Sequence, residues 1–407
     1  MENSTPRVSV VIPAYNQSKY LGDAIRSVLS QTYRDFEIIV VDDGSTDDTP
    51  LVVSQLGGNL HYIRQNNQGL AGARNTGIRN AKGSYIALLD SDDIWLPDFL
   101  QKMMSLVAEV PDAIVYYCCA RCIDTEGNDL PQIVDSKFVP YDTMYETLVK
   151  ANFIIPSTVV MLRSAVLAAG LFDASFRACE DWDLWLRLAP TCHFTSIREC
   201  LVKYRLHGSS LSADPQKMQL AVKAVIEKHF GPDDEDMGNW PNVKRMAYGG
   251  VYRYHAWTSV LRQRDWDSCT QHVKKALQVD PNTSRDLDFF YDLAMGTQPL
   301  GYRGTPKLLD LQANALHVDQ MLSKVFDEAT ASAEKRFQGE TYGTAYFALG
   351  LVAYNTGQFS LCRNYLFKAL RNRPDLWKDS RVLGNILKSF LGRTLLGWIR
   401  KMHGKPT

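Results

Sequence analysis

Short apolar runs alternate with amphipathic stretches in the first part of the chain. Each run is rich in β-branched and aliphatic residues and has the length of a buried strand: 8–12, 37–41, 60–64 and 85–89. Between them, apolar residues recur at helical spacing near 18–30, 47–56 and 70–81. Strands that alternate with helices predict an α/β domain with a mostly parallel sheet between helices. Two further strands are predicted at 159–162 and 192–204, with a helix between them at 181–188.

Polar residues follow the predicted strands, where each strand ends. In open α/β sheets, ligands bind beyond the carboxyl ends of the strands. The segments at those ends are Pro13 to Asn16, Asp42 to Ser45, Gln65 to Gly69 and Asp90 to Asp93. One edge of the sheet is therefore expected to collect aromatic, amide, carboxylate and glycine groups and to bind the ligand.

The composition changes at residues 230–236, which are acidic and turn-forming. Such a stretch is typical of a domain boundary, and strand signals nearly vanish beyond it. We therefore expect residues 1–215 to form the α/β domain, residues 216–240 to form a helix and an acidic linker, and residues 241–407 to form an all-α domain.

The C-terminal half contains a weak internal repeat, in which residues 252–281 align without gaps on residues 345–374. Trp266 meets Phe359, and both segments end on proline. Two helices joined by a short turn and closed by proline resemble tetratricopeptide units, and a helical-repeat array would offer a protein partner a surface. The offset of 93 residues is not a multiple of the 34-residue unit, so an irregular array or an insertion is expected. A plain helical bundle is the alternative.

Composition and charge exclude some classes of protein. The 407 residues are 45% hydrophobic and 22% charged, which leaves room for two or three globular domains. A net charge of zero and a pI of about 7.1 provide no global field that would attract nucleic acid. The N-terminus lacks a secretory leader pattern, and no stretch reaches the roughly 18 uninterrupted apolar residues of a membrane span, so we expect a soluble, cytoplasmic protein.

The eight cysteines lack the density of a disulfide framework, and reduced thiols are expected. Only the cluster of Cys118, Cys119 and Cys122 has a spacing that suits a metal. It follows an apolar run and lacks a second pair of ligands. Cysteines of a buried strand are therefore favoured over a zinc site.

The segment Asp90-Ser91-Asp92-Asp93 places three carboxylates within four positions directly after a predicted strand. Adjacent carboxylates repel one another, so they are expected either in water or around a cation. A solvated turn that caps the next helix, with Pro97 in its first turn, is one alternative. Its position at the ligand edge favours the other, and hard oxygen ligands favour Mg²⁺ or Mn²⁺ over zinc.

Residues 8–49 and 67–100 together resemble the nucleotide-binding start of the inverting family 2 glycosyltransferases. The second segment, NQGLAGARNTGIRNAKGSYIALLDSDDIWLPDFL, carries the family's Gly-x-x-x-Ala-Arg-Asn and Asp-x-Asp motifs. The resemblance covers about 210 residues and implies a GT-A-like fold with a nucleotide-sugar donor. The donor would be of the UDP or dTDP type.

The resemblance also implies roles for individual residues. Tyr15 would stack on the base, Asp43 would accept its N3–H, and Asp42 would brace the loop. Asp92 is the expected metal ligand, while Asp93 is an ambiguous third carboxylate. The full set implied for nucleotide binding is Pro13, Tyr15, Asp43, Arg74, Asp90 and Ser91.

Inverting transfer is a single displacement, so a carboxylate must take the proton of the acceptor hydroxyl. The segment CEDWDLWLRL (179–188) resembles the family's Glu-Asp base motif, and Asp181 is the expected base, with Glu180 and Asp183 as alternates. N-terminal helix charge would also explain all three. The segment KYRLHGSSLS (203–212) resembles a motif in which His207 would approach the metal or diphosphate, and Arg205 would help hold the leaving group.

The expected function is the transfer of one sugar to an acceptor hydroxyl in polysaccharide, lipid-linked glycan or cell-surface glycan synthesis. The acceptor would be a glycan, a lipid-linked glycan or a protein. Single transfer is favoured because neither the Gln-x-x-Arg-Trp-type segment nor the membrane helices of processive synthases occur in the sequence. A metal-dependent nucleotidyltransferase and a non-catalytic helical-repeat scaffold are the alternatives.

The C-terminal segment 387–405 has apolar residues at helical spacing, including Phe390, Leu395 and Trp398, with interspersed Lys and Arg. This pattern suits a peripheral contact with the inner face of the plasma membrane. A helix that closes the repeat array is the favoured alternative.

Overall fold

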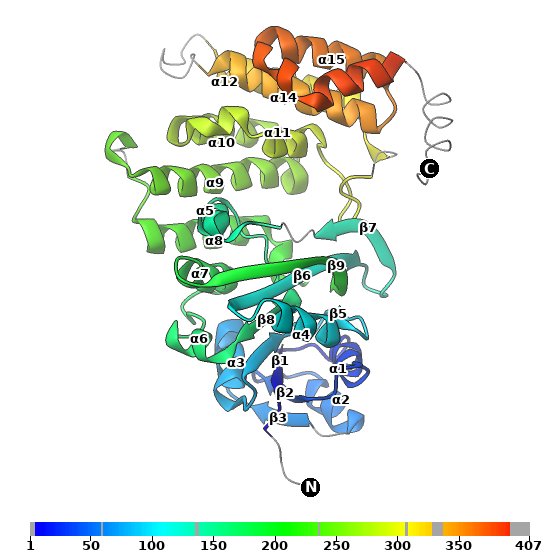
Figure 1. Ribbon diagram of the computed structural model, residues 1–407, viewed down its shortest axis with the longest axis vertical. Coiled ribbons are helices and arrows are strands. Elements are labelled where there is room, and N and C mark those ends of the chain that lie inside the picture. The colour runs from blue at the N-terminus through cyan, green and yellow to red at the C-terminus, as the bar shows by residue number, and fades with distance from the viewer. Residues whose placement is uncertain are drawn as a thin grey trace. The chain divides into compact units, whose positions relative to one another are not determined.

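The computed structural model describes residues 5–57, 60–134, 138–234, 237–305, 308–327 and 337–390 (Figure 1). The chain divides into two compact units, of which the first ends at Pro232 and the second begins at Asp233. This division lies within the predicted linker 216–240, and the three-part domain limits stay a prediction. The outer part of the basic C-terminal segment, residues 391–405, lies outside the described residues.

The first unit is built on a sheet whose described strands follow the order β3-β2-β1-β4-β8-β6-β9-β5, with β7 paired to β6. The four strands predicted in the first part of the chain are parallel neighbours. They are β1 Val8–Ala14, β2 Phe36–Asp42, β3 Leu60–Arg64 and β4 Tyr85–Leu88.

The second half of the sheet is mixed, whereas the alternating pattern predicted a mostly parallel sheet. The strands β5 Ile94–Trp95, β6 Ala113–Ile123, β7 Asp129–Val134, β8 Val159–Leu162 and β9 His193–Arg205 complete it. Strands β6 and β9 are parallel, but β8 runs antiparallel to both β4 and β6. The reason is local: η1 (Pro156–Thr158) brings the chain to the carboxyl end of β4, so a strand that starts there must run in the opposite direction.

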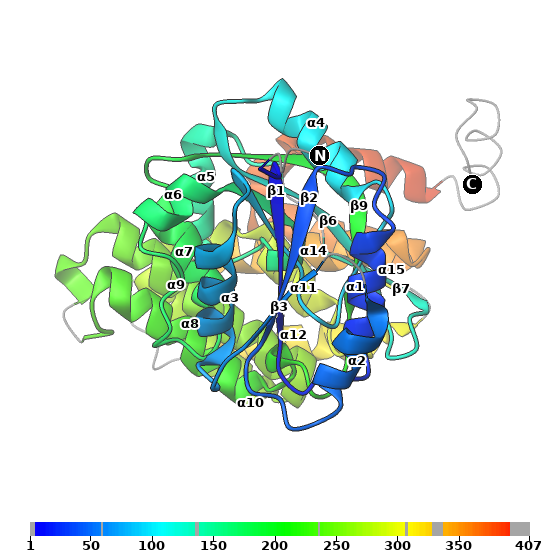
Figure 2. The ribbon, with the colours of Figure 1, turned by 90° about the horizontal axis from the view of Figure 1, so that it is seen from below.

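Helices cover both faces of this sheet, as Figure 2 shows for β1 and β2, with α3 on one side and α1 and α2 on the other. The helices of the unit are α1 Leu21–Leu29, α2 Thr49–Leu56, α3 Gly69–Asn80, α4 Phe99–Glu109, α5 Tyr141–Lys150, α6 Arg163–Ala168, α7 Glu180–Leu188 and α8 Pro215–Phe230. Leu21, Ile25 and Val28 of α1 pack in a core with Val10 and other strand residues. On the opposite face of the sheet, α3 packs closely against β1, because a Cβ on Gly77 of α3 would collide with Val11.

The cysteine cluster lies in β6, as predicted for a buried strand. Cys118, Cys119 and Cys122 are buried and form no disulfide, and burial raises the pKa of Cys122 to about 12. A thiol with a pKa raised this far stays protonated at neutral pH and is a poor ligand and nucleophile.

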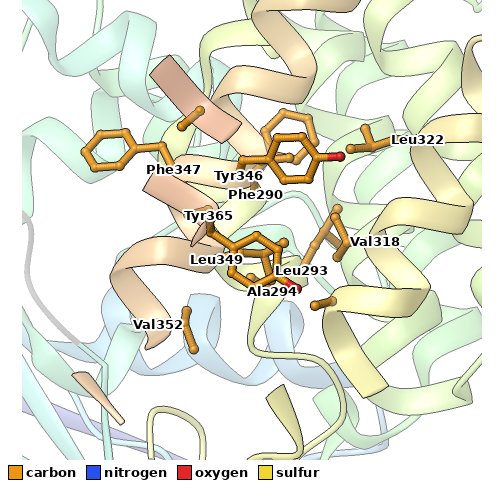
Figure 3. Close-up of a cluster of buried hydrophobic side chains, with 14 of the residues drawn as sticks. Phe290, Leu293, Ala294, Val318, Leu322, Tyr346, Phe347, Leu349, Val352 and Tyr365 are labelled. Atoms are coloured by element: carbon orange, nitrogen blue, oxygen red, sulfur yellow. The ribbon is translucent and has the colours of Figure 1, made fainter. Parts of the chain in front are cut away.

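The described residues of the second unit form helices joined by loops, with no strand among them. Its helices are α9 Asn242–Thr258, α10 Trp266–Val279, α11 Leu287–Ala294, α12 Leu311–Val325, α14 Gln338–Asn355 and α15 Phe359–Asn372, followed by helical residues 380–390. Figure 3 shows part of its core, where Phe290 and Ala294 of α11 lie among residues of α12 and α14 such as Val318 and Phe347. None of the helices in the described part of the chain is both long and apolar enough to cross a membrane.

The predicted internal repeat corresponds to two copies of the same local structure. In the first copy, α9 and α10 are followed by the 3₁₀ helix η5 Pro281–Arg285 and by α11. In the second copy, α14 and α15 are followed by η7 Pro374–Lys378 and by the helical residues 380–390. The helix pairs closed by proline are thus confirmed, and each copy carries one helix more than the alignment covered.

Candidate active site

The loop after β4 holds the predicted metal motif, and its three carboxylates have different surroundings. Asp93 is 1% exposed; its two oxygens accept hydrogen bonds from the Ser157 hydroxyl at 2.5 Å and the Arg205 backbone N–H at 2.9 Å. Burial, with the charges of Asp92 and Asp90, raises the pKa of Asp93 well above its usual range. Asp93 therefore joins this loop to the start of β8 and the end of β9.

Asp92 is the carboxylate of this loop that meets the histidine segment. Its Oδ2 lies 2.9 Å from Nε2 of His207, and its side chain is 20% exposed. His207 Nδ1 lies 2.8 Å from the Ser209 hydroxyl, and its ring lies 5.1 Å from that of Tyr20. The structure thus brings together Asp92 and His207, which are 115 positions apart in the sequence.

Arg205 is buried and donates hydrogen bonds to the backbone of this loop and of the loop after β6. Its Nε donates to the backbone carbonyl of Asp92 at 2.9 Å, and its Nη1 donates to the carbonyls of Asp124 and Thr125. The guanidinium lies 4.6 Å from the centre of the Tyr20 ring. Arg205 therefore fixes the backbone on which Asp92 stands.

Arg74 of α3 joins the metal motif to the predicted base motif. Its Nη2 donates to Oδ1 of Asp90 at 2.6 Å, and its Nη1 donates to Oε1 of Glu180. The side chain is 1% exposed and packs over the Phe172 ring. Burial alone would lower the pKa of Arg74, but Asp90 and Glu180 raise it, so the arginine stays charged.

Asp181, the expected base, lies at the first turn of α7. Its Oδ1 accepts the Trp182 backbone N–H at 2.8 Å, and its Oδ2 accepts the Asn152 side-chain amide at 3.0 Å. Burial and the neighbouring Glu180 raise the pKa of Asp181 to about 7, although Arg74 and the two donors oppose the shift. A carboxylate with this pKa can take and release a proton near neutral pH.

The two alternates for the base are engaged in other contacts. Glu180 is buried against Arg74. Asp183 is fully buried and accepts hydrogen bonds from Arg187, Lys228 and His229. Burial alone would raise the pKa of Asp183, but these donors lower it, and the residue ties α7 to α8.

The remaining residues expected at the nucleotide lie along the carboxyl ends of β1, β2 and β4. Tyr15 is 49% exposed just after β1, whereas Pro13 and Ser91 are buried. Asp42 accepts hydrogen bonds from the Ser45 backbone N–H and the Tyr62 hydroxyl, and its bracing role stays a prediction.

Asp43 is 2% exposed and accepts three hydrogen bonds, from the Gln65 side chain and from the backbone N–H groups of Gln68 and Gly69. Beside it, Gly44, Arg64, Gln65, Asn66 and Asn67 line an open hollow of about 630 Å³. The loop after β3 therefore borders a space at the end of the sheet where the ligand was expected.

Three residues of this site have no signal in the sequence. Asn152 and Ser157 lie outside the motifs, and Tyr20 lies within the segment 8–49 but had no role assigned to it. The three residues contact Asp181, Asp93 and Arg205 respectively. Only the position of Ser157 in a Pro-Ser-Thr turn before a predicted strand could have drawn attention to it.

The residues of this site could supply only some of the ligands of a divalent cation. Among the described residues, no group of three or more His, Cys, Asp or Glu is placed to hold a metal. Asp92 Oδ2 and His207 Nε2 are 2.9 Å apart, close to the roughly 3 Å between adjacent ligands of an octahedral Mg²⁺ or Mn²⁺ with bonds of about 2.1 Å. A set of one or two protein ligands fits a cation that takes its other ligands from water and substrate phosphates.

Comparison with known proteins assigns the chain to one family. The family model described as glycosyl transferase family 2 matches residues 9–168. TuaG of Bacillus subtilis (strain 168), named for teichuronic acid biosynthesis, is 32% identical over 240 residues, which cover 56% of this chain and 92% of TuaG. The chain belongs to glycosyl transferase family 2, with an N-terminal GT-A-like unit followed by a helical unit.

Two further relatives bear on the comparison. The Escherichia coli UDP-Glc:alpha-D-GlcNAc-diphosphoundecaprenol beta-1,3-glucosyltransferase WfgD is 33% identical over 214 residues, which cover 52% of this chain and 81% of WfgD. The crystal structure of Staphylococcus aureus TarS 1–349 with UDP-GlcNAc matches with a TM-score of 0.49 and 16% identity, over 82% of this chain and 90% of that one. The chain spans 65% of the length of the uncharacterized glycosyltransferases from Rickettsia prowazekii and Rickettsia typhi.

Proposed function

We propose that this protein transfers one sugar from a UDP- or dTDP-type nucleotide sugar to an acceptor hydroxyl, with inversion at the anomeric carbon. The observation that carries the proposal is the pair of hydrogen bonds from Arg74 to Asp90 and Glu180. Through them, one buried side chain connects the motif expected at the donor diphosphate to the motif expected to supply the base. Membership of glycosyl transferase family 2 supports the same reaction class.

Asp181 acts as the general base in this proposal. With a pKa of about 7, its carboxylate is ionised in about half of the molecules at neutral pH and is basic enough to accept the proton of an acceptor hydroxyl as the bond to the sugar forms. The Trp182 N–H and the Asn152 amide each hold one oxygen of the carboxylate, so its orientation is set before the acceptor binds. The other alternates are less suitable, since Glu180 and Asp183 are each committed to cationic partners.

Asp92 and His207 are the residues that would hold Mn²⁺ or Mg²⁺. The cation would supply positive charge next to the departing diphosphate. The contact of His207 with Ser209 can hold the imidazole in the tautomer whose Nε2 is free to ligate. Arg205 contributes by fixing the backbone of Asp92, because its Nε donates to the Asp92 carbonyl and its Nη1 to the carbonyl of Asp124.

The base and ribose of the donor are proposed to lie over the hollow beside Asp43. The exposed ring of Tyr15 is available for stacking on a pyrimidine, and Asp43 retains lone pairs that are not used by its three donors. Asp90, which Arg74 holds in place, is proposed to contact the ribose.

The acceptor is proposed to be a growing polysaccharide or a lipid-linked glycan of the cell surface. The names of two relatives support this class, since TuaG is named for teichuronic acid biosynthesis and WfgD for transfer to a diphosphoundecaprenol-linked sugar. Transfer of a single sugar is the simplest reaction consistent with the absence of a processive-synthase segment from the sequence.

The decisive experiment is a panel of nucleotide sugars incubated with the full chain and Mn²⁺, with the release of nucleoside diphosphate and free or transferred sugar measured by mass spectrometry. Release of UDP or dTDP from one sugar supports the proposal. Release of pyrophosphate from a nucleoside triphosphate and a sugar phosphate would instead identify a nucleotidyltransferase. Inactivity with all donors, together with metal-independent nucleotide affinity, would favour the scaffold.

A further inference from the structure

The last helical segment of the second unit has two apolar stripes rather than one. Val382, Ile386 and Ser389 point into the core and are at most 7% exposed. The second stripe consists of Leu383, Leu387 and Phe390, which are 45%, 68% and 66% exposed. We refer to these three residues as the outer stripe. Side chains at spacings of three and four lie on one side of a helix, so the outer stripe is a continuous apolar strip.

In the first copy of the internal repeat, two positions that correspond to this stripe are covered. With the offset of 93 residues, Leu383 corresponds to Phe290 and Leu387 corresponds to Ala294. In the first copy both positions are at most 1% exposed, because α11 packs against α14 and α12 (Figure 3). In the equivalent helix of the second copy, the two positions that are buried in the first copy are therefore exposed to solvent.

The segment of the chain that carries the outer stripe is strongly basic. Residues 359–390 contain seven basic residues and two acidic ones, a net charge of +5 in a protein whose total is zero. Both acidic residues are paired, Asp375 with Arg373 and Asp379 with Arg381. The sequence that follows, 391–407, adds four basic residues and no acidic one.

One arginine contacts the outer stripe, and two lysines lie on its helix or just ahead of it. The Arg363 guanidinium lies 4.6 Å from the centre of the Phe390 ring and donates to the Ser389 carbonyl at 2.9 Å. Lys388 is an exposed neighbour of Leu387 on the same helix. Ahead of the helix, the ring of Trp377 is 59% exposed, with the Lys378 ammonium 5.9 Å from it.

We propose that the outer stripe is a docking surface for an anionic phospholipid bilayer. Aliphatic and aromatic side chains bordered by Lys and Arg match the boundary between acyl chains and charged headgroups. A second copy of the chain fits less well, since it would bring the same positive charge against this one. The surface would hold the enzyme beside lipid-linked substrates without a membrane span.

Vesicle flotation tests this proposal with the full chain. The protein should float with vesicles of equal parts phosphatidylcholine and phosphatidylglycerol, and not with phosphatidylcholine alone. Leu387→Gln combined with Phe390→Gln should weaken partition by about tenfold or more, because two side chains lose their apolar contact with lipid. Leu220→Gln, at an equally exposed leucine of α8, is the matched control and should float like the wild type.

The contribution of the lysines to vesicle binding is tested with a second pair of double variants. Lys378→Glu with Lys388→Glu should also reduce partition by about tenfold or more, and raised salt should do the same. Lys82→Glu with Lys275→Glu makes the same change in net charge at exposed positions elsewhere and should leave partition largely intact. Nucleotide-sugar hydrolysis should be unchanged in all of these variants, which separates the result from the proposed function.

Three outcomes would overturn the proposal. Equal flotation with both kinds of vesicle would show that anionic lipid is not recognised. A dimer in light scattering that Leu387→Gln with Phe390→Gln converts to a monomer, without flotation of the wild type, would assign the stripe to a self-interface. A fall in thermal stability in that variant but not in Leu220→Gln, again without flotation, would show that the chain itself covers the stripe.

Discussion

The side-chain amide of Asn152 donates a hydrogen bond of 3.0 Å to Oδ2 of Asp181. The amide oxygen of Asn152 accepts the Ile154 backbone N–H at 3.2 Å, so its NH₂ group is directed at the carboxylate. The loop between α5 and η1 thus contributes to the surroundings of the proposed base, although no motif marks it.

Replacing Asn152 with alanine should move the pH dependence of catalysis. The amide donates to the charged form of Asp181 and lowers its pKa, so its loss should raise the pKa further above about 7. The rise of kcat/KM with pH should then occur at higher pH, and activity at neutral pH should fall more than activity at about pH 9. Asn80→Ala, at an exposed asparagine of α3, is the control, and an unshifted profile in Asn152→Ala would contradict the prediction.

Asp181→Asn should abolish proton transfer while leaving the donor site intact. We expect nucleotide affinity within about twofold of wild type and a loss of transfer of at least about a hundredfold, which is typical of a removed general base. Calorimetry with UDP or dTDP and a transfer assay measure the two effects. Retained activity would move the base to Glu180, and Asp112→Asn at an exposed turn controls for the loss of one carboxylate.

Asp92→Asn should remove the metal-dependent part of nucleotide binding. An amide is a weaker ligand for a hard cation than a carboxylate, and the contact with His207 is altered as well. Calorimetric titration of UDP and dTDP with and without Mn²⁺ should show a metal-dependent gain in affinity for wild type and little for the variant. If the wild type bound the nucleotide equally well with and without Mn²⁺, the assignment of Asp92 as a metal ligand would be wrong.

Arg74→Lys keeps the charge but cannot maintain two directed contacts. A single ammonium cannot reproduce the fork that reaches Asp90 and Glu180 in different directions. We expect both nucleotide affinity and turnover to fall, with turnover falling by about a hundredfold because base and donor lose their common anchor. Arg79→Lys in the same helix is the control, and wild-type kinetics in Arg74→Lys would refute the bridging role.

Asp183→Asn should destabilise the first unit without directly touching the reaction. The variant leaves Arg187, Lys228 and His229 without their shared carboxylate, and we expect a loss of about 3 kcal/mol of unfolding free energy, at the lower end for buried pairs because Lys228 is partly exposed. The folded pKa of Asp183 is lowered, so its contribution is present above the unfolded value of about 3.9 and is lost as pH falls through the folded pKa. Urea unfolding at neutral and acidic pH should show the difference shrinking in acid, and no difference at neutral pH would contradict it.

The sequence could predict the elements of the first unit because their signals are local. Alternating apolar runs predicted β1 to β4 and the three helices between them. Most of the predicted ends lie within about two residues of the observed ends. The resemblance to family 2 glycosyltransferases also placed Asp90, Asp92 and Asp181 in motifs of known chemistry, and the proline-closed helix pairs were visible as a repeat. In each case one stretch of chain carries the whole pattern, so no distant contact is needed to recognise it.

Tertiary structure alone decided which of the charged residues are exposed, paired or perturbed. Asp92 and Asp93 are neighbours in the sequence, but their contacts differ. Asp92 contacts His207, whereas Asp93 is buried and accepts hydrogen bonds from Ser157 and Arg205. The contacts of Arg74 and Asn152 join segments up to 106 residues apart. Burial and hydrogen bonding depend on what those distant segments bring, because the pKa of a carboxyl is set by its surroundings in space and not by its neighbours in the chain.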